Sequence, residues 1–274
     1  MKKQSKLKRI SIIYKDNDKF AKETSLEISE YLTRKKFDVS IIENNSKGIA
    51  EVEYRKWKNI DLLIVIGGDG TIIKSARMLK QYIPILGIKA GNKGILTEIE
   101  PSELPNSIKK IKLKKYHIEK IPKLNIDFGK NKTECAVNEI YIEKFNTTRT
   151  PIFNIKTKND SMDMKMDGVV ISTPIGSTGY SLSFGSSILA SSIDALLLTP
   201  IASISRIPSI IIPWEKITIT IPHKTSITID GQIMSKVPAK QKITITKDIN
   251  ATAFVRFTKS NFRRMKKMGY NDNS

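Results

Sequence analysis

The strongest constraint on the fold is an unbroken apolar segment, residues 62–66, that ends at Gly67-Gly68-Asp69-Gly70. A strand that is apolar at every position needs cover on both faces, as in a parallel sheet with helices on either side. Further strands are predicted at 10–14, 38–42 and 84–88, and segments with helical spacing lie between them at 16–36 and 71–81. This alternation predicts a doubly wound α/β domain over residues 1–100.

The second half of the chain has a different periodicity. Apolar and polar residues alternate strictly at 217–221, 226–229 and 242–246, and most of the apolar residues are β-branched. Closely spaced strands of this kind predict a β-rich, sandwich-like domain over residues 101–257. The remaining tail, 258–274, is basic with Phe262, Met265 and Met268 at a spacing of three. We expect it to form a short helix that docks back on the first domain.

The chain has 274 residues, of which 47 are Lys or Arg and 27 are Asp or Glu, and its formal net charge is +20. Such a charge permits two interpretations, attraction to polyanions or a lysine-rich solvated surface. The lysines are dispersed and aromatic residues make up only 7% of the chain. Both observations favour the solvated surface, because a nucleic-acid-binding protein is expected to carry aromatic residues or a continuous basic stripe.

Two further classes are disfavoured by composition. No apolar run approaches the roughly 18 residues of a membrane-spanning helix, so no membrane partner and a cytoplasmic location are predicted. One cysteine and two distant histidines exclude an internal disulfide and argue against a zinc site. No metal bound by the protein's own side chains is predicted.

The first chemical motif is Gly67-Gly68-Asp69-Gly70-Thr71, at the carboxyl end of the buried strand and the start of a helix. Ligands of open α/β sheets bind at this edge. Glycines let backbone amides turn inward, and such amides at a helix N-terminus suit phosphate oxygens. Asp69 is unusual there, because a carboxylate repels phosphate. It either caps the helix in an ordinary tight turn, or accepts a proton or holds a metal.

Two more motifs lie in the second half. Asn138-Glu139 places a polar pair within a strand that is otherwise apolar, which alone also fits a strand end that reaches solvent. From Asp167 to Ser183 a strand is followed by a cluster of hydroxyl residues and glycines with one tyrosine, Tyr180. Hydroxyls and free amides suit sugar hydroxyls and an adenine edge, although an ordinary serine-rich loop has the same composition.

In order and approximate spacing, the three motifs resemble those of the NAD kinase family, over nearly the whole chain. Gly-Gly-Asp-Gly-Thr is shared with 6-phosphofructokinases and diacylglycerol-type lipid kinases, whereas the other two motifs are more specific. The resemblance implies a two-domain phosphotransferase with an alcohol acceptor. It would transfer the terminal phosphate of ATP, accompanied by Mg²⁺, to the 2′-hydroxyl of the adenosine ribose of NAD. It also implies a homotetramer.

The resemblance also implies a role for individual residues. Asp69 would be the general base, the loop amides would meet phosphates, and Gln232 would lie at the edge of the adenosine pocket. The full set of implied nucleotide-binding residues is Gly67, Gly68, Asp69, Gly70, Thr71, Lys74, Asn138, Glu139, Arg149, Lys165, Asp167, Thr178, Gly179, Tyr180, Ser181, Leu182, Ser183 and Gln232.

The sequence departs from the family pattern at three informative positions. Ile175 replaces a threonine that is common between Pro and Gly, and Gly179 replaces the usual alanine before the tyrosine. Ile204 stands near the place where a histidine or aromatic residue is often found. The last departure concerns the nicotinamide end of the pocket.

Two alternatives remain at this stage, a diacylglycerol-type lipid kinase of the same superfamily and a non-enzymatic basic nucleic-acid-binding protein. The lipid kinase should lack the Asn-Glu pair and the Thr-Pro-x-Gly-Ser-Thr element, and this chain has both. The sequence leaves open the choice between NAD and NADH as acceptor, and between ATP and polyphosphate as donor.

Overall fold

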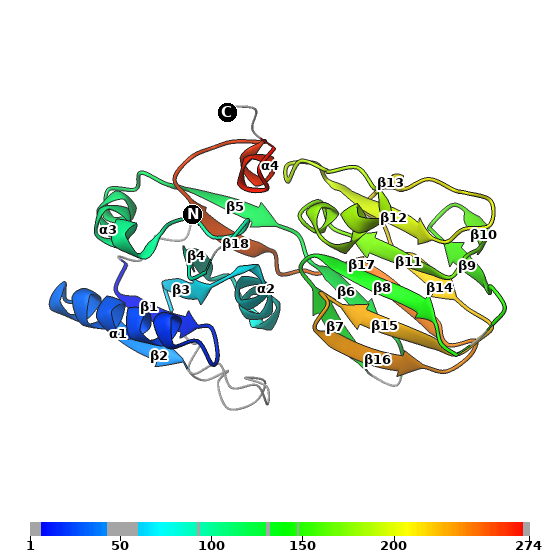
Figure 1. Ribbon diagram of the computed structural model, residues 1–274, viewed down its shortest axis with the longest axis horizontal. Coiled ribbons are helices and arrows are strands. Elements are labelled where there is room, and N and C mark those ends of the chain that lie inside the picture. The colour runs from blue at the N-terminus through cyan, green and yellow to red at the C-terminus, as the bar shows by residue number, and fades with distance from the viewer. Residues whose placement is uncertain (1–6, 43–59, 92–93, 130–131, 147, 271–274) are drawn as a thin grey trace. The chain divides into compact units, whose positions relative to one another are not determined.

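The computed structural model describes residues 7–42, 60–91, 94–129, 132–146 and 148–270. The chain forms two compact units. One consists of Met1–Lys120 together with Thr252–Ser274, and the other of Ile121–Ala251 (Figure 1).

The first unit is built on a sheet of order β2-β1-β3-β4-β18-β5. Every pairing from β2 across to β18 is parallel. The strands are β1 (Arg9–Tyr14), β2 (Asp38–Ile42), β3 (Leu62–Gly67), β4 (Pro84–Lys89), β5 (His117–Ile121) and β18 (Thr252–Arg256). β3 is buried along its whole length, as its unbroken apolar sequence predicts.

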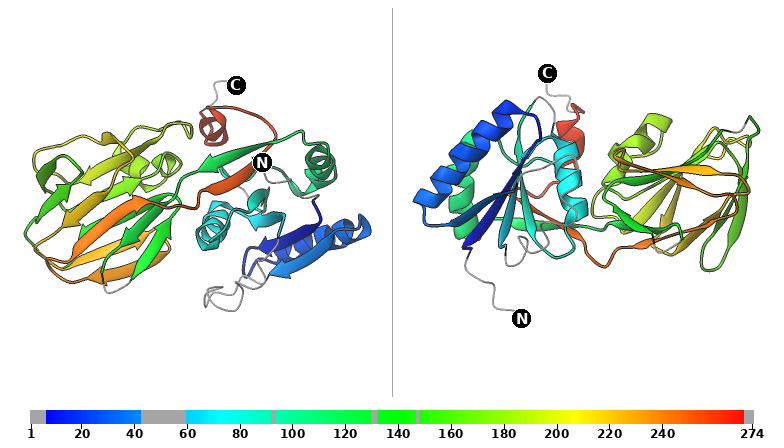
Figure 2. Two further views of the ribbon diagram at one scale, coloured as in Figure 1. Left: turned by 180° about the vertical axis from the view of Figure 1, so that it is seen from behind. Right: turned by 90° about the horizontal axis from the view of Figure 1, so that it is seen from below.

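Helices cover both faces of this sheet (Figure 2). Its α-helices are α1 (Lys19–Arg34), α2 (Asp69–Met78), α3 (Leu104–Lys112) and α4 (Arg263–Lys267), and the short 3₁₀ helix η1 (Pro101–Glu103) precedes α3. Leu32 of α1 and Ile108 of α3 pack in one cluster with Ile64 and Ile66 of β3. Because side chains alternate along a strand, the intervening residues of β3 face α2. The doubly wound α/β fold is confirmed.

Four elements of the first unit lie within residues 101–257, which were predicted to form the β-rich domain. They are η1, α3, β5 and β18, and β18 pairs with β4 as a parallel strand. β18 is fully buried, which suits an inner strand of a covered sheet. Its sequence neighbours are alternating strands, and proximity in sequence does not decide which sheet a buried strand joins.

The second unit consists of two antiparallel sheets, of order β10-β9-β14-β17-β6-β7 and β13-β12-β11-β8-β15-β16. Apolar side chains from both sheets form one core, which includes Phe153 of β9 and Ile140 of β8. This is the expected β-rich sandwich. Its elements are β6 (Leu124–Asp127), β7 (Thr133–Ala136), β8 (Glu139–Lys144), β9 (Ile152–Lys156), β10 (Ser161–Lys165), β11 (Gly168–Ser172), η2 (Gly176–Thr178), η3 (Tyr180–Phe184), β12 (Ala195–Ile201), β13 (Ile210–Pro213), β14 (Ile217–Thr220), β15 (Thr225–Ile229), β16 (Ile233–Val237) and β17 (Lys242–Lys247).

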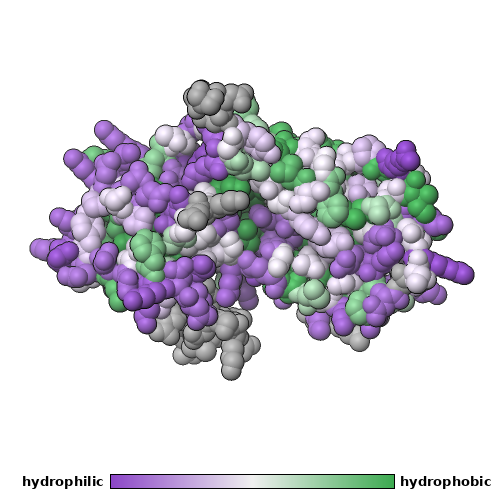
Figure 3. Space-filling view, in the orientation of Figure 1, coloured by the Kyte–Doolittle hydropathy of each residue, from purple (hydrophilic) through white to green (hydrophobic). Residues whose placement is uncertain are grey.

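The surface of the first unit around α1 and α3 is mostly hydrophilic (Figure 3). None of the helices in the described ranges is long and apolar enough to cross a membrane.

Candidate active site

The Gly67-Gly68-Asp69-Gly70 turn joins β3 to α2 in the first unit. Gly68 is the N-cap residue of α2, no side chain caps the helix, and Asp69 is the first helical residue. Asp69 therefore does not cap the helix, and that interpretation of its role is wrong. Packing favours a glycine at position 67, because a Cβ there would lie 2.7 Å from Oγ1 of Thr71.

The Asp69 carboxylate is held by a loop that lies far along the chain. Its Oδ2 accepts a hydrogen bond from the Ile95 amide at 3.0 Å, and its Oδ1 accepts one from the Leu96 amide at 2.8 Å. Asp69 is only half-buried, and each carboxylate oxygen keeps a second lone pair. The group is fixed in orientation and remains able to accept a proton.

A cavity of about 530 Å³ lies in the second unit. It is lined by Glu139, Tyr141, Thr178, Gly179, Tyr180, Ser183, Thr228 and Gly231. The structure thus brings together Glu139 and four of the predicted residues from 178 to 183.

The Asn138-Glu139 pair lies where the chain enters β8, against the turn that follows β11. Thr173 fixes the backbone there, because its hydroxyl donates to the Val137 carbonyl at 2.8 Å and its amide donates to the Asn138 carbonyl at 2.9 Å. A Cβ at Gly176 would lie 2.0 Å from the Asn138 carbonyl oxygen. Gly176 is therefore required by the close approach of the two segments.

Asp230 is the residue that the sequence analysis missed as a site residue. It is buried, and its carboxylate accepts hydrogen bonds from the amides of Val137 at 3.0 Å, Asn138 at 2.8 Å and Glu139 at 3.2 Å. One carboxylate thus fixes the backbone of the Asn-Glu pair. The available signal was Asp230-Gly231-Gln232 directly after an alternating strand.

Glu139 has an unusual environment for a carboxylate. It is 7% exposed, and its Oε2 has no hydrogen-bond partner in the part of the chain that the structure describes. Burial and, to a smaller extent, the nearby Asp230 charge raise the pKa of Glu139 to about 7, against the opposing effect of a hydrogen bond from the Tyr180 amide. Its protonation therefore changes near neutral pH.

Aromatic rings form one wall of the cavity. Tyr180 packs edge-to-face against Tyr141, with ring centroids 5.2 Å apart, and against Phe184 at 5.0 Å. The Tyr141 hydroxyl donates to Glu143 at 2.8 Å, and desolvation, followed by this hydrogen bond, raises the Tyr141 pKa well above its usual range. Tyr180 remains 44% exposed, so it presents a positioned ring to a ligand.

The other predicted residues are placed differently. Ser181 is buried and pairs with the Ser172 hydroxyl at 2.5 Å, so it supports the loop, and Leu182 is half-buried. Asp167 forms an ion pair with Lys144 at 2.8 Å. Arg149, Lys165 and Gln232 are exposed and are not among the residues that line the cavity. Asp69 and Lys74, a half-buried residue of α2, belong to the first unit.

The described residues contain no group of three or more His, Cys, Asp or Glu side chains placed to hold a metal ion. The Asp69 carboxylate uses both oxygens on backbone amides, and each oxygen keeps a second lone pair.

Comparisons with known proteins match both halves of the chain. Family models of the ATP-NAD kinase N-terminal and C-terminal domains match residues 10–116 and 137–257. An NAD kinase of Pyrococcus furiosus is 35% identical over 211 residues, which cover 73% of this chain and 75% of that protein.

Two solved structures have the same fold. An NAD kinase of Archaeoglobus fulgidus in complex with ATP has a TM-score of 0.76 at 26% identity, over 95% of this chain and 97% of the other. A yeast NADH kinase complexed with NADH has a TM-score of 0.85 at 21% identity, over 99% of this chain and 90% of the other. The latter likeness concerns the fold alone.

Proposed function

This chain belongs to the NAD kinase family, and on that premise we propose that it transfers the terminal phosphate of ATP to the 2′-hydroxyl of the adenosine ribose of NAD, giving NADP. The observation that carries the proposal is the cavity of the second unit, in which buried Glu139 lies beside the exposed ring of Tyr180. The comparisons support neither the lipid kinase nor the nucleic-acid-binding alternative.

The cavity suits the adenosine part of a dinucleotide. The unpartnered Oε2 of Glu139 is an acceptor for ribose hydroxyl protons, and in its ionised form it accepts from two hydroxyls. Tyr180 offers a ring edge or face to adenine, and the hydroxyls of Thr178 and Ser183 complete the polar lining. We assign the remaining family-implied residues, Asn138, Arg149, Lys165, Asp167, Ser181, Leu182 and Gln232, to NAD binding or to support of this pocket.

Asp69 is assigned as the general base. A ribose hydroxyl becomes a good nucleophile when a carboxylate takes its proton. The 2′-oxygen then forms a bond to the terminal phosphorus of ATP while the bond from that phosphorus to the bridging oxygen breaks, and ADP leaves. The amides of Gly68 and Gly70, at the N-terminus of α2, and the Lys74 amine are assigned to the donor's phosphates.

We assign the divalent metal ion to the phosphates of ATP rather than to side chains of the protein. A divalent cation, proposed to be Mg²⁺, enters on the phosphates of ATP and neutralises their charge. Membership of an ATP-using kinase family supports this assignment. A homotetramer, implied by the family resemblance, and a cytoplasmic location, predicted from the lack of a long apolar run, are part of the same proposal. Light scattering that gives the monomer mass of 30.9 kDa at micromolar concentration would refute the tetramer.

One assay tests the activity directly. Purified protein is incubated with NAD, ATP and Mg²⁺, and NADP is measured with an NADP-specific dehydrogenase. Matched reactions replace NAD with NADH, ATP with polyphosphate, or NAD with diacylglycerol vesicles. Formation of NADP that depends on NAD and the phosphate donor supports the proposal. Phosphorylation of the lipid without formation of NADP would overturn it.

A further inference from the structure

One peptide group connects the C-terminal helix α4 to the Asp69 carboxylate. The Ile95 carbonyl accepts a hydrogen bond from Arg263 Nη1 at 3.0 Å. The amide of the next residue, Leu96, belongs to the same peptide plane and donates to Asp69 Oδ1 at 2.8 Å. A cation, a peptide dipole and a carboxylate are therefore aligned in series.

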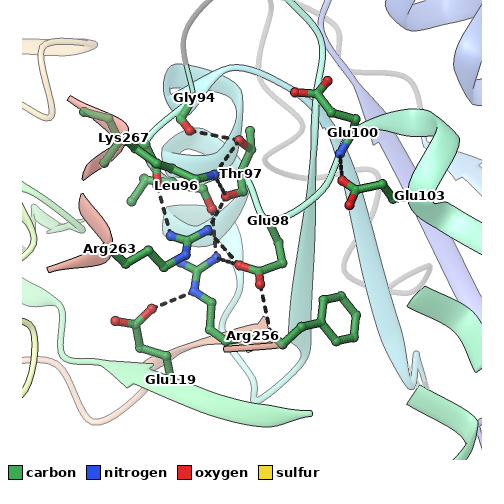
Figure 4. Close-up of polar contacts among 12 residues, drawn as sticks. Gly94, Leu96, Thr97, Glu98, Glu100, Glu103, Glu119, Arg256, Arg263 and Lys267 are labelled. Carbon is green, nitrogen blue, oxygen red and sulfur yellow. Dashed lines mark hydrogen bonds and ion pairs between the residues drawn. The ribbon is translucent and has the colours of Figure 1, made fainter. Parts of the chain in front are cut away.

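Cationic side chains also bind the carbonyls of the next two residues (Figure 4). Arg256 Nη1 donates to the Leu96 carbonyl at 3.0 Å, and the Thr97 carbonyl accepts from both Arg263 and Lys267. Every carbonyl from 95 to 97 thus receives a hydrogen bond from a cationic side chain of the C-terminal segment. On the other side of the loop, the Ile95 and Leu96 amides hold Asp69.

The guanidinium of Arg263 is itself fixed. Glu98 pairs with Arg263 at 2.7 Å and with Arg256 at 3.2 Å, and Arg256 also pairs with Glu119 at 2.7 Å. The side chains of Arg256 and Glu98 are 2% and 5% exposed. A buried, hydrogen-bonded ion network of this kind permits few alternative arrangements, so it holds Arg263 at one position relative to the loop.

We propose that Arg263 and Lys267 of α4 are positioning residues for the phosphoryl transfer, which hold the 95–97 loop so that its amides orient the Asp69 carboxylate. The inference rests on the proposed function of Asp69. A cation on a carbonyl polarises the whole peptide group and strengthens its N–H as a donor. The alternative is that these cations only attach the C-terminal segment to the first unit, in which case they affect stability and not turnover.

Kinetic constants of single variants separate the two roles. In Arg263→Gln and Lys267→Met we expect kcat to fall, by about tenfold to a hundredfold for Arg263→Gln, since a misplacement of about 1 Å has that effect. KM for NAD and ATP should change less than about twofold, because uniform binding is untouched. Arg263→Lys should recover part of kcat, since one cationic donor remains. Lys266→Met is the matched control, because Lys266 is an exposed cation of the same helix, and it should retain the wild-type kcat.

A double-variant cycle decides whether the effect passes through Asp69. If Arg263 acts on turnover only by orienting this carboxylate, Arg263→Gln should lower kcat no further in an Asp69→Asn background. Equal fold-losses in both backgrounds, or a normal kcat in Arg263→Gln and Lys267→Met, would overturn the proposal. Lys267→Met keeps the test valid if Arg263→Gln unfolds, because Lys267 is more exposed than Arg263. Wild-type protein that forms no NADP would refute the proposed function instead.

Discussion

Asp230 and Glu139 are joined by two hydrogen bonds, one to the Asp230 carboxylate and one between backbones, while their charges repel each other. The Asp230 carboxylate accepts the Glu139 amide at 3.2 Å, and the Asp230 amide donates to the Glu139 carbonyl at 3.0 Å. Asp230 also contributes to the raised pKa of Glu139. The residue that fixes the Asn-Glu pair thus also determines part of the charge state of the proposed ribose acceptor.

Replacing Asp230 with Asn should damage both the pocket and the fold. The amide group of Asn would direct an N–H toward backbone amides that need an acceptor, because Asp230 receives three such donors. We expect KM for NAD to rise about tenfold and stability to fall by about 1–3 kcal/mol, measured by steady-state kinetics and urea unfolding. Asp194→Asn is the control, since Asp194 is an exposed carboxylate of the same unit. A normal KM would show that Asp230 does not position the pair.

NAD affinity should depend on pH through Glu139. Because its pKa is about 7, the ionised acceptor is lost as the pH falls through 7. If NAD binds only the ionised form, KM for NAD should rise about tenfold between pH 8 and pH 6. The same profile in Glu139→Gln should be flat. A tenfold rise that persists in Glu139→Gln would assign the titration to another group.

The raised pKa of Glu139 also predicts how the stability of the fold changes with pH. The pKa of Glu139 rises from 4.5 to about 7 on folding, so the folded state binds the proton more tightly between these values. Stability must fall as the pH rises through this window. Glu139→Gln, which cannot ionise, should be more stable than wild type at pH 8, by at most about 3 kcal/mol. The difference should vanish below about pH 4.5, and urea unfolding at both pH values measures it.

Gly179, where the family usually has alanine, lies against the proposed acceptor. A Cβ at this position would be 2.6 Å from Glu139 Oε2 and 3.1 Å from the Gly176 carbonyl oxygen. The φ of −93° lies outside the left-handed region that favours glycine, so the prediction rests on these two contacts. We expect Gly179→Ala to displace the carboxylate and raise KM for NAD about threefold with little change in kcat. Ser187→Ala, on the same loop, is the control, and an unchanged KM would mean that the carboxylate moves without consequence.

Ile204 offers a test of the nicotinamide end of the pocket. It is 59% exposed, and its amide donates to the Lys165 carbonyl at 3.0 Å. An aliphatic side chain neither stacks on a ring strongly nor donates a hydrogen bond. We expect Ile204→His to increase the preference between NAD and NADH, measured as the ratio of their kcat/KM values. An unchanged ratio would show that position 204 does not contact the ring.

The structure of the first unit could be predicted wherever the sequence of a single segment was enough to identify its element. β3 is such a case, because its apolar run and the glycines that follow define both a covered strand and its ligand-binding edge. β18 was expected in the β-rich domain, because its actual partner β4 lies far away in the chain. β12 is buried over its first five residues and likewise has no alternation, and periodicity alone does not distinguish such a segment from a buried helix.

The sequence predicted the residues that would contact a ligand, but not the distant groups that hold those residues in place. Glu139 and Tyr180 stand within recognisable motifs, whereas Asp230 acts on residues about 90 positions earlier in the chain. Asp69 is likewise held by amides 26 and 27 positions away. Such backbone amides have no sequence signature, because every residue except proline carries one.

Replacing Asp69 with Asn tests the proposed base. We expect kcat to fall by two to four orders of magnitude, roughly the contribution of general-base catalysis, because the amide cannot accept the ribose proton at neutral pH. The fold should also weaken, by about 1–3 kcal/mol, since one of the two amides that Asp69 receives would face an N–H group. Asp61→Asn is a matched control, because Asp61 at the other end of β3 accepts the amides of Lys8 and Arg9, both at 2.9 Å. Both amides bond Oδ2 of Asp61, and the carbonyl oxygen of Asn can replace it, so this variant should lose little stability and keep the wild-type kcat. If folded Asp69→Asn retains more than about a tenth of the wild-type kcat, Asp69 is not the base.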